Sequence, residues 1–147
     1  IRDLFLFSCY TGISYGDMCL LTKDDLVTDE NGTLWIRTSR KKTKVEYEVP
    51  LLEVPLHILS KYRDVEPNGK LLPMYCNSDV NKYLKTIATK CGINRRIVFH
   101  AARHTYATEI TLSHGVPLET VSKMLGHTRV DTTQIYAKVT DDKIKAR

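Results

Sequence analysis

The stretch over residues 99–136 constrains the fold most, because it gathers the arginine, histidine and tyrosine side chains best suited to chemistry. His100 and Arg103 stand three residues apart in an alanine-containing segment, so a helix there would project both from one face. One unbroken helix would put His127 and Tyr136 on opposite faces, roughly 13 Å apart. The glycine before His127 is a natural helix stop, and Asp or Thr residues after it can cap a new helix. The pattern therefore predicts a turn that can bring the histidine and the phenol to one site.

Apolar periodicity and turn residues predict a mainly helical chain with one small sheet. Helices are expected at residues 4–9, after Ser14, and at 55–63, 77–90, 100–114 and 118–125. Strands are expected at residues 25–28, 33–38 and 45–49, joined by a turn with Asn-Gly and by a basic turn. Asn77 or Ser78 is expected to cap the helix that follows, and five tyrosines are expected in the core: Tyr10, Tyr15, Tyr62, Tyr83 and Tyr106. The expected class is α+β, mainly α, with a three-stranded antiparallel sheet.

Composition limits the kind of protein. A chain of 147 residues, 42% of them hydrophobic, can bury one core, so residues 1–147 are expected to form a single domain. The net charge of +5 favours a polyanionic partner. No apolar run approaches the roughly 20 residues that span a bilayer, so no membrane partner is expected. The four cysteines form no Cys-x-x-Cys pair and are expected to be buried, reduced thiols, as in a cytoplasmic protein: Cys9, Cys19, Cys76 and Cys91.

An arginine, two histidines and a tyrosine held at one site suit attack of the phenol on a phosphodiester. The guanidinium of Arg103 can bind two phosphate oxygens at once, although a structural ion pair is the alternative. His100 can orient the phosphate or move the tyrosine proton, or it can be a satisfied core histidine. His127 can donate a hydrogen bond to the phosphate, or it can interact with carbonyls at a helix end. His100 and His104 would suit a metal pair, but Ala101 stands where a zinc hydrolase carries its glutamate, so no metal is expected.

The order and spacing of these motifs resemble a known family. His-x-x-Arg at 100–103, Leu-Gly-His at 125–127 and Tyr136 nine residues later resemble the tyrosine recombinase (phage integrase) family. Two further motifs match upstream, namely Thr-Gly-Ile-Ser-Tyr-Gly-Asp at 11–17 and Lys-Lys-Thr at 41–43 with Val-Pro-Leu at 49–51. The matches cover nearly the whole chain, and the residues in these motifs are most similar to those in integrases of Bacteroides-type mobile elements.

The resemblance implies the catalytic domain of a site-specific DNA recombinase or integrase. Such an enzyme cleaves and rejoins double-stranded DNA through a 3′-phosphotyrosyl intermediate and needs neither ATP nor metal. It implies a homo-tetramer on DNA, with accessory DNA-bending proteins as further candidate partners, in the bacterial cytoplasm at the nucleoid. The chain opens without Met inside a helical pattern, which is typical of a fragment. Core-binding and arm-binding domains are therefore expected to precede it in the intact protein.

The resemblance also assigns the remaining site residues. Lys42, eight residues before Pro50, matches the hairpin lysine that would protonate the leaving 5′ oxygen, with Lys41 and Lys44 as rivals and a solvated turn as the alternative. Asp17 matches an acidic position expected to support the catalytic groups, and capping a helix is its equal alternative. Ser14 stands where the family usually has its first catalytic arginine.

One phosphate clamp is thus missing, and several arginines could fold toward the site to replace it: Arg2, Arg37, Arg40, Arg95 and Arg96. Basic side chains in the hairpin and before His100 are predicted to bind DNA: Arg40, Lys41, Lys44, Arg95 and Arg96. Two rival functions stay open. A type IB topoisomerase uses similar residues to relax DNA, and a DNA-binding relict or regulator would keep the fold without efficient catalysis.

Overall fold

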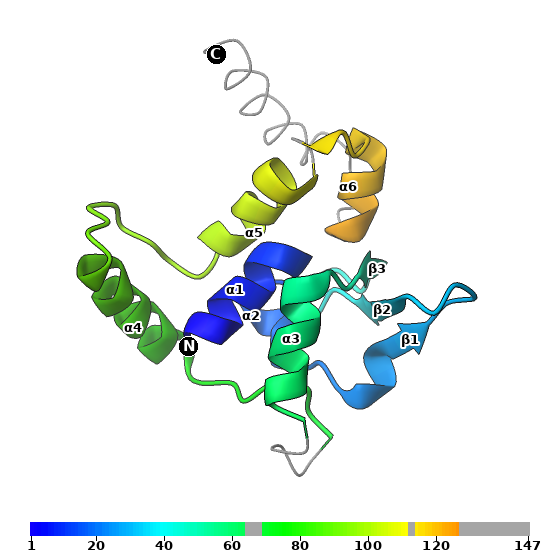
Figure 1. The fold of residues 1–147 in the computed structure, drawn as a ribbon, viewed down its shortest axis with the longest axis horizontal. Coiled ribbons are helices and arrows are strands. Elements are labelled where there is room, and N and C mark those ends of the chain that lie inside the picture. The colour runs from blue at the N-terminus through cyan, green and yellow to red at the C-terminus, as the bar shows by residue number, and fades with distance from the viewer. Residues whose placement is uncertain (64–68, 112–113, 127–147) are drawn as a thin grey trace.

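The computed structural model describes residues 1–63, 69–111 and 114–126. The helices are α1 (Arg2–Thr11), α2 (Tyr15–Met18), α3 (Glu53–Lys61), α4 (Asn77–Lys90), α5 (Ala101–Thr105) and α6 (Leu118–Met124), with a 3₁₀ turn η1 (Lys23–Asp25) and a π-helical segment η2 (Tyr106–Thr111). The strands are β1 (Leu26–Thr28), β2 (Leu34–Ser39) and β3 (Glu46–Pro50). These elements confirm the predicted mainly helical α+β class (Figure 1).

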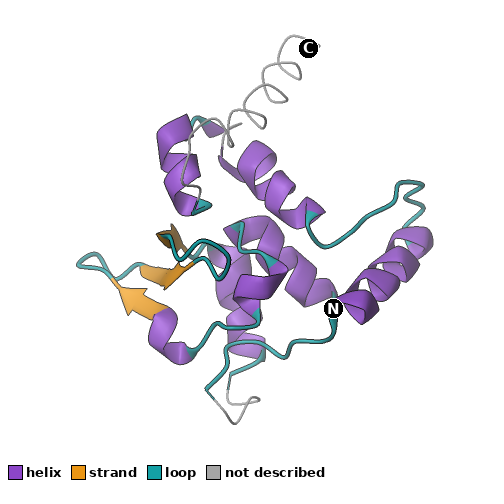
Figure 2. Ribbon diagram, turned by 180° about the vertical axis from the view of Figure 1, so that it is seen from behind, coloured by secondary structure: helices purple, strands orange, loops and turns teal. Residues whose placement is uncertain are grey.

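Helix α1 forms the centre of the helical part. It packs against α3, α5 and η2, and it buries Leu4 and Phe7 completely or nearly so (Figures 1 and 2). Its predicted end is confirmed, because Gly12 has a φ of 75° and its N–H donates to the Ser8 carbonyl at 2.8 Å. A Cβ at Gly12 would overlap the ring of Tyr106, so only glycine lets α1 end this close to η2.

The predicted sheet is confirmed, with each strand within one residue of its expected bounds. The strand order is β1-β2-β3, and both pairs are antiparallel, with Trp35 opposite both Val27 and Pro50. Alternate residues of β3 face the core, so that Tyr47 and Val49 are buried and their neighbours are not. The turn after β2 closes where the Arg40 N–H donates to the Val45 carbonyl at 2.8 Å.

Four details of the sequence prediction are wrong. Helix α4 is preceded by Cys76 with no side-chain cap, rather than by Asn77 or Ser78. Tyr83 is 52% exposed, because the buried stripe of α4 runs along neighbouring positions and leaves it at the edge. Cys76 and Cys91 are exposed rather than buried, since they stand at the two open ends of α4. The expected helix over 100–114 is divided into α5 and the wider π-helical η2.

Other expectations hold. All four cysteines are free thiols, and Cys9 is buried. Tyr106 packs in the core at 2% exposure.

Within the described ranges, no helix has the length and apolar character to cross a membrane.

Candidate active site

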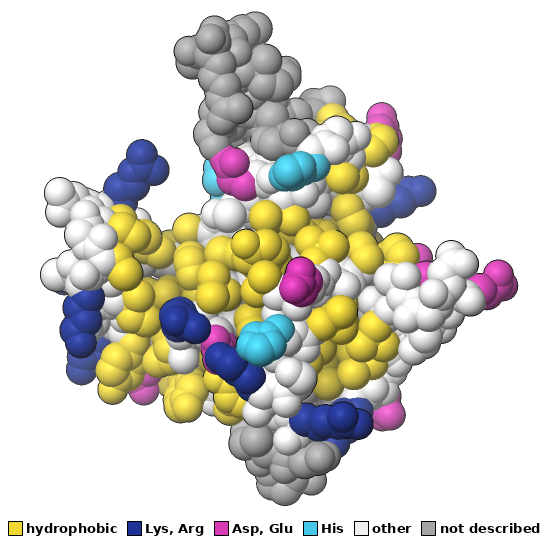
Figure 3. Space-filling view, in the orientation of Figure 1, with side chains coloured by type: hydrophobic (Ala, Val, Ile, Leu, Met, Phe, Trp, Pro, Cys, Tyr) yellow, Lys and Arg dark blue, Asp and Glu magenta, His cyan; other side chains and the backbone are white. Residues whose placement is uncertain are grey.

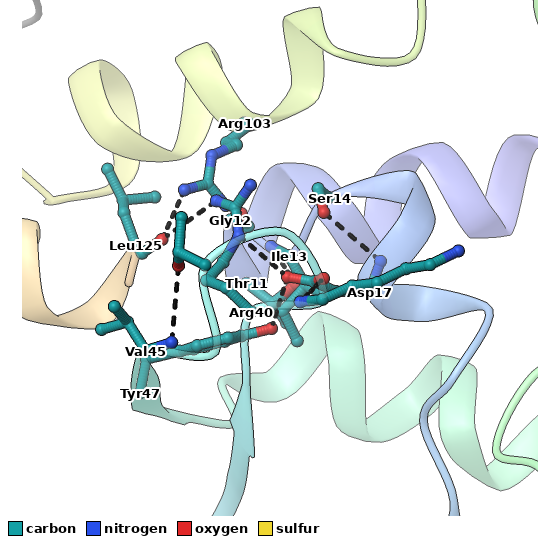
Figure 4. A network of polar contacts seen from close by, with 12 residues as sticks. Thr11, Gly12, Ile13, Ser14, Asp17, Arg40, Val45, Tyr47, Arg103 and Leu125 are labelled. Atoms are coloured by element: carbon teal, nitrogen blue, oxygen red, sulfur yellow. Dashed lines mark hydrogen bonds and ion pairs between the residues drawn. The ribbon is translucent and has the colours of Figure 1, made fainter. Parts of the chain in front are cut away.

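Arg103 lies at the meeting point of three helices. Its side chain, on α5, is 3% exposed. One guanidinium nitrogen donates to the Gly12 carbonyl at the end of α1 at 2.9 Å, and the other donates to the Leu125 carbonyl at the end of α6 (Figure 4). Arg103 is therefore a buried cation that holds the ends of α1 and α6 beside each other through these two carbonyls.

Arg40 reaches the same carbonyl from the sheet. Its Nη1 donates to Leu125 O at 3.3 Å, so two guanidinium groups meet at one acceptor (Figure 4). Gly126 makes this approach possible, because its φ is 71° and a Cβ there would lie 2.6 Å from Arg40 Cγ. The sequence alone could not choose among the arginines that might complement Arg103, and the structure brings Arg40 to it.

The other candidate arginines lie elsewhere. Arg37 forms an exposed ion pair with Glu48 at 3.1 Å. Arg2 approaches Asp3 at 3.9 Å, and its side chain is 71% exposed. Residues 95–96 are exposed in the loop after α4. In the described part of the chain, these four arginines are thus exposed or paired at the surface, whereas Arg40 reaches the Leu125 carbonyl beside Arg103.

Asp17 anchors the base of the basic hairpin. Its carboxylate is 4% exposed, and its Oδ2 lies 3.2 Å from Arg40 Nε and accepts a hydrogen bond from the Tyr47 hydroxyl at 3.1 Å. Its Oδ1 accepts from the Lys41 N–H at 2.9 Å. The Arg40 contact is an ion pair outside hydrogen-bond geometry, and within the described chain Nε has no hydrogen-bond partner. Burial, and then the Asp17 charge, raise the pKa of Tyr47, so this phenol stays protonated as a donor.

The capping interpretation of Asp17 holds for its backbone and not for its side chain. Ser14 caps α2, and its hydroxyl accepts from the Asp17 N–H at 3.4 Å, as the capping pattern predicted. The Asp17 carboxylate points instead to the hairpin, where it contacts Arg40 and Lys41. The backbone of Asp17 thus belongs to the cap and its side chain to the site, while its support of catalysis stays a prediction.

His100 stands at the N-cap of α5 rather than inside a helix, with φ −60° and ψ −23°. Its side chain is exposed, in contrast to that of Arg103. Partial desolvation, and then the charges of Arg103 and Arg40 and the neighbouring His104, lower the pKa of His100 below its ordinary value. A neutral imidazole is therefore favoured near neutral pH, which suits a proton acceptor. His100 and Ser14 line one 350 Å³ pocket.

The three hairpin lysines differ in how they are held. The Lys41 backbone is bound to Asp17, and Lys44 adopts a left-handed φ of 63° where the turn reverses. Lys42 lies between them with an exposed side chain. A tethered backbone beside an exposed, long side chain suits a mobile proton donor, and the assignment of Lys42 stays a prediction.

Comparison with known proteins identifies the family. The model of the phage integrase family matches residues 1–143. The chain belongs to that family. It is 34% identical over 150 residues to the tyrosine recombinase XerD of Listeria monocytogenes serotype 4b (strain F2365), covering 92% of this chain and 48% of that protein. The chain thus spans about half the length of this relative.

Solved integrase-family structures share the fold. The crystal structure of XerA recombinase matches with a TM-score of 0.76 at 24% identity, over 99% of this chain and 60% of that one. The Tn1549 transposon integrase, in complex with a circular intermediate DNA, matches with a TM-score of 0.69 at 18% identity, over 91% of this chain and 52% of that one.

A basic groove runs beside the site of this integrase-family chain. An 830 Å³ groove lies between α4 and residues 93–98, and the described residues that line it include no acidic side chain. Figure 3 shows Lys and Arg side chains at the edge of the molecule occupied by α4 and the loop after it. Arg95 and Arg96 were predicted from the sequence to bind DNA, whereas Lys82 and Lys85 were not. The three-residue spacing of the two lysines places them on one face of a helix, which could have indicated them. The four cations are Lys82, Lys85, Arg95 and Arg96.

Two predicted catalytic residues, His127 and Tyr136, lie outside the described residues. The described chain ends at Gly126, directly before His127, beside the two guanidinium groups. Within the described ranges, no group of at least three His, Cys, Asp or Glu side chains could hold a metal ion.

Proposed function

We propose that residues 1–147 form the catalytic domain of a site-specific DNA recombinase or integrase that cleaves and rejoins strands through a 3′-phosphotyrosyl intermediate. The convergence of Arg40 and Arg103 on the Leu125 carbonyl carries this proposal. Two guanidinium groups at one acceptor form a site for an anion with several oxygens, such as a phosphodiester. Membership of the phage integrase family over residues 1–143 supports the same chemistry.

The proposed reaction is a transesterification. The Tyr136 oxygen attacks the DNA phosphorus while His100, neutral because of its lowered pKa, accepts the phenol proton. The bond from phosphorus to the 5′ oxygen breaks, and Lys42 protonates that oxygen. Arg103 and His127 bind the non-bridging oxygens, where charge builds in the transition state. Attack by the 5′-OH of a partner strand on the phosphotyrosine then releases Tyr136 and forms the exchanged strand.

We further propose that Arg40 supplies the phosphate clamp that Ser14 cannot. Three observations support it: Arg40 shares an acceptor with Arg103, it is fixed by the buried carboxylate of Asp17, and it adds to the charges that lower the pKa of His100. Its side chain is 17% exposed, so a phosphate oxygen could approach it from one side.

The proposed partner is double-stranded DNA, seated on the hairpin lysines and on the basic groove beside α4. We propose a homo-tetramer on two DNA sites, aided by DNA-bending proteins, in the bacterial cytoplasm at the nucleoid. The residues of the motifs support an integrase of a Bacteroides-type mobile element as the parent protein. Salt tests the DNA contact, because each phosphate neutralised releases counterions and makes the affinity fall steeply with ionic strength.

The decisive experiment is capture of a covalent adduct on a nicked suicide substrate by the full-length protein. Wild type should form the adduct, and Tyr136→Phe, which removes only a hydroxyl, should not. An adduct formed by Tyr136→Phe would show that the nucleophile is another residue. Absence of any wild-type adduct would favour the DNA-binding relict. Relaxation of supercoiled DNA without exchange between paired sites would favour the topoisomerase.

A further inference from the structure

Asn81 on α4 binds the main chain directly before His100. Its Oδ1 accepts a hydrogen bond from the Phe99 N–H at 2.8 Å, and its Nδ2 donates to Asn77 Oδ1 at 3.5 Å. Asn81 is half-buried, and Phe99 is 2% exposed with its ring edge-on to Tyr15, 5.8 Å between centroids. The Asn81 acceptor therefore satisfies a main-chain donor in a partly buried bond, and loss of the bond would remove that partner of the Phe99 N–H.

The segment after this bond leads straight into the helix that carries the catalytic candidates. Three successive N–H groups bond to carbonyls three residues earlier: Ala101 to Val98 at 3.0 Å, Ala102 to Phe99 at 3.0 Å and Arg103 to His100 at 3.1 Å. No side chain caps the start of α5. The Asn81 side chain, from another helix, thus holds the residue at which this turn begins, and the position of His100 follows from it.

Asn81 also lies on the boundary between two hollows. It lines the 830 Å³ basic groove, where Lys82 follows it in sequence and Lys85 is one turn further along α4. It equally lines the 350 Å³ pocket that contains Ser14 and His100. Phosphates bound by the two lysines would therefore contact the same turn of α4 from which Asn81 accepts the hydrogen bond of the Phe99 N–H.

We infer that Asn81 is a positioning residue through which DNA seated on the basic groove of α4 fixes His100 for proton transfer. The inference rests on the proposed recombinase function. It assigns Asn81 no contact with the reacting atoms, since its described bonds go to Phe99 and Asn77.

The first measurement needs no catalysis. Hydrogen exchange of residues 97–103, followed by mass spectrometry, is compared in the full-length protein with and without a random-sequence DNA duplex. In wild type, DNA should slow this exchange. Asn81→Ala should exchange faster without DNA and lose most of the DNA-induced protection. Asn77→Ala is the matched control, because it removes only the 3.5 Å partner of Asn81 Nδ2 and leaves Asn81 Oδ1 to accept from the Phe99 N–H, so it should behave like wild type.

The second measurement separates positioning from DNA binding. With saturating suicide substrate, Asn81→Ala should form the adduct about tenfold more slowly, while its DNA affinity stays within about twofold of wild type. Asn81→Asp keeps an oxygen acceptor for the Phe99 N–H but adds negative charge beside the groove. It should therefore recover the single-turnover rate while binding DNA more weakly.

Each outcome decides the matter. The inference fails if Asn81→Ala changes only DNA affinity, if Asn81→Asp is as slow as Asn81→Ala, or if exchange of residues 97–103 is unaffected. Should Asn81→Ala not fold, Asn81→Gln keeps the amide one methylene further out and must show the same loss of protection. If wild type forms no adduct while the exchange results are as expected, the recombinase function and the proton transfer at His100 fail, and what stands is the coupling of DNA on α4 to residues 97–103 through Asn81.

Discussion

Replacing Gly126 by alanine tests whether Arg40 acts at the site. A Cβ at Gly126 would lie 2.6 Å from Arg40 Cγ and 3.0 Å from Tyr47 Cδ1. Cγ is near the root of the arginine side chain, so relieving this overlap moves the whole guanidinium away from the Leu125 carbonyl. The φ of 71° adds a backbone cost of about 1–2 kcal/mol for any residue with a Cβ.

Gly115 provides the matched control. Its φ is 82°, and within the described chain no atom lies within 4 Å of a Cβ placed there. Gly115→Ala should therefore pay the same backbone cost without moving Arg40. If Arg40 is a preorganised donor to the transition state, its displacement should slow cleavage by roughly 10²–10³, as loss of such a donor does in other enzymes.

The assay is single-turnover formation of the covalent adduct, with thermal unfolding measured in parallel. Both variants should lose the backbone cost, and Gly126→Ala should lose more stability because of its overlap with Arg40 and Tyr47, but only Gly126→Ala should lose cleavage. A double-mutant cycle then isolates the cause, because Gly126→Ala should have little further effect on cleavage once Arg40→Ala is present. If Gly126→Ala costs another factor of about 10² in that background, its effect runs through another group, such as His127, and the reasoning about Arg40 is wrong.

Three further predictions follow from the same site. Arg103→Lys keeps the charge but loses the guanidinium fork, so adduct formation should fall by on the order of 10² or more, and activity within a few-fold of wild type would contradict a clamp role. The pKa of His100 is lowered from 6.5, so its ring binds fewer protons in the folded than in the unfolded chain. Cleavage should therefore be fast, and the contribution of His100 to folding stability complete, above pH 6.5, and both should be lost as the pH falls through the folded pKa. His100→Ala should flatten the pH dependence of the cleavage rate and of the stability. Ser14→Arg should change the wild-type rate by no more than about tenfold, or 1.4 kcal/mol, and should restore part of the activity of Arg40→Ala; an inert wild type activated by Ser14→Arg alone would refute the replacement by Arg40.

Local chemistry explains which parts of the fold could be predicted from the sequence. Gly12 ends α1 because a left-handed residue is needed there, and Ser14 begins α2 by binding the Asp17 N–H, so both boundaries are encoded within a few residues. The strands of the sheet are likewise encoded by alternating residues and by the turns between them. By contrast, Cys76 and Tyr83 were predicted to be buried and are exposed. Their exposure depends on how α4 is oriented against the core, which the residues of α4 specify only approximately.

The direction of Arg40 was the main feature that the sequence could not reveal. In residues 40–44 it is one of four basic side chains, a pattern typical of a solvated turn. Its inward direction depends on Asp17, on an earlier helix, and on the missing side chain of Gly126, far along the chain. Ser14 signalled that a cation was absent, but only the tertiary contacts indicate which arginine lies beside Arg103.

Charge balance gives a physical reason for placing Asp17 beside the two arginines. Two guanidinium groups meeting at the neutral Leu125 carbonyl repel each other, and burial strengthens that repulsion. The buried carboxylate of Asp17 offsets one of them, which leaves one net positive charge among these three groups and matches the single negative charge of a phosphodiester. In the proposed reaction the phosphate carries more negative charge in the transition state, so the proposed site would gain more there than in the ground state, especially if Lys42 protonates the leaving oxygen as proposed. Such a charge balance would favour the proposed chemical step over DNA binding alone.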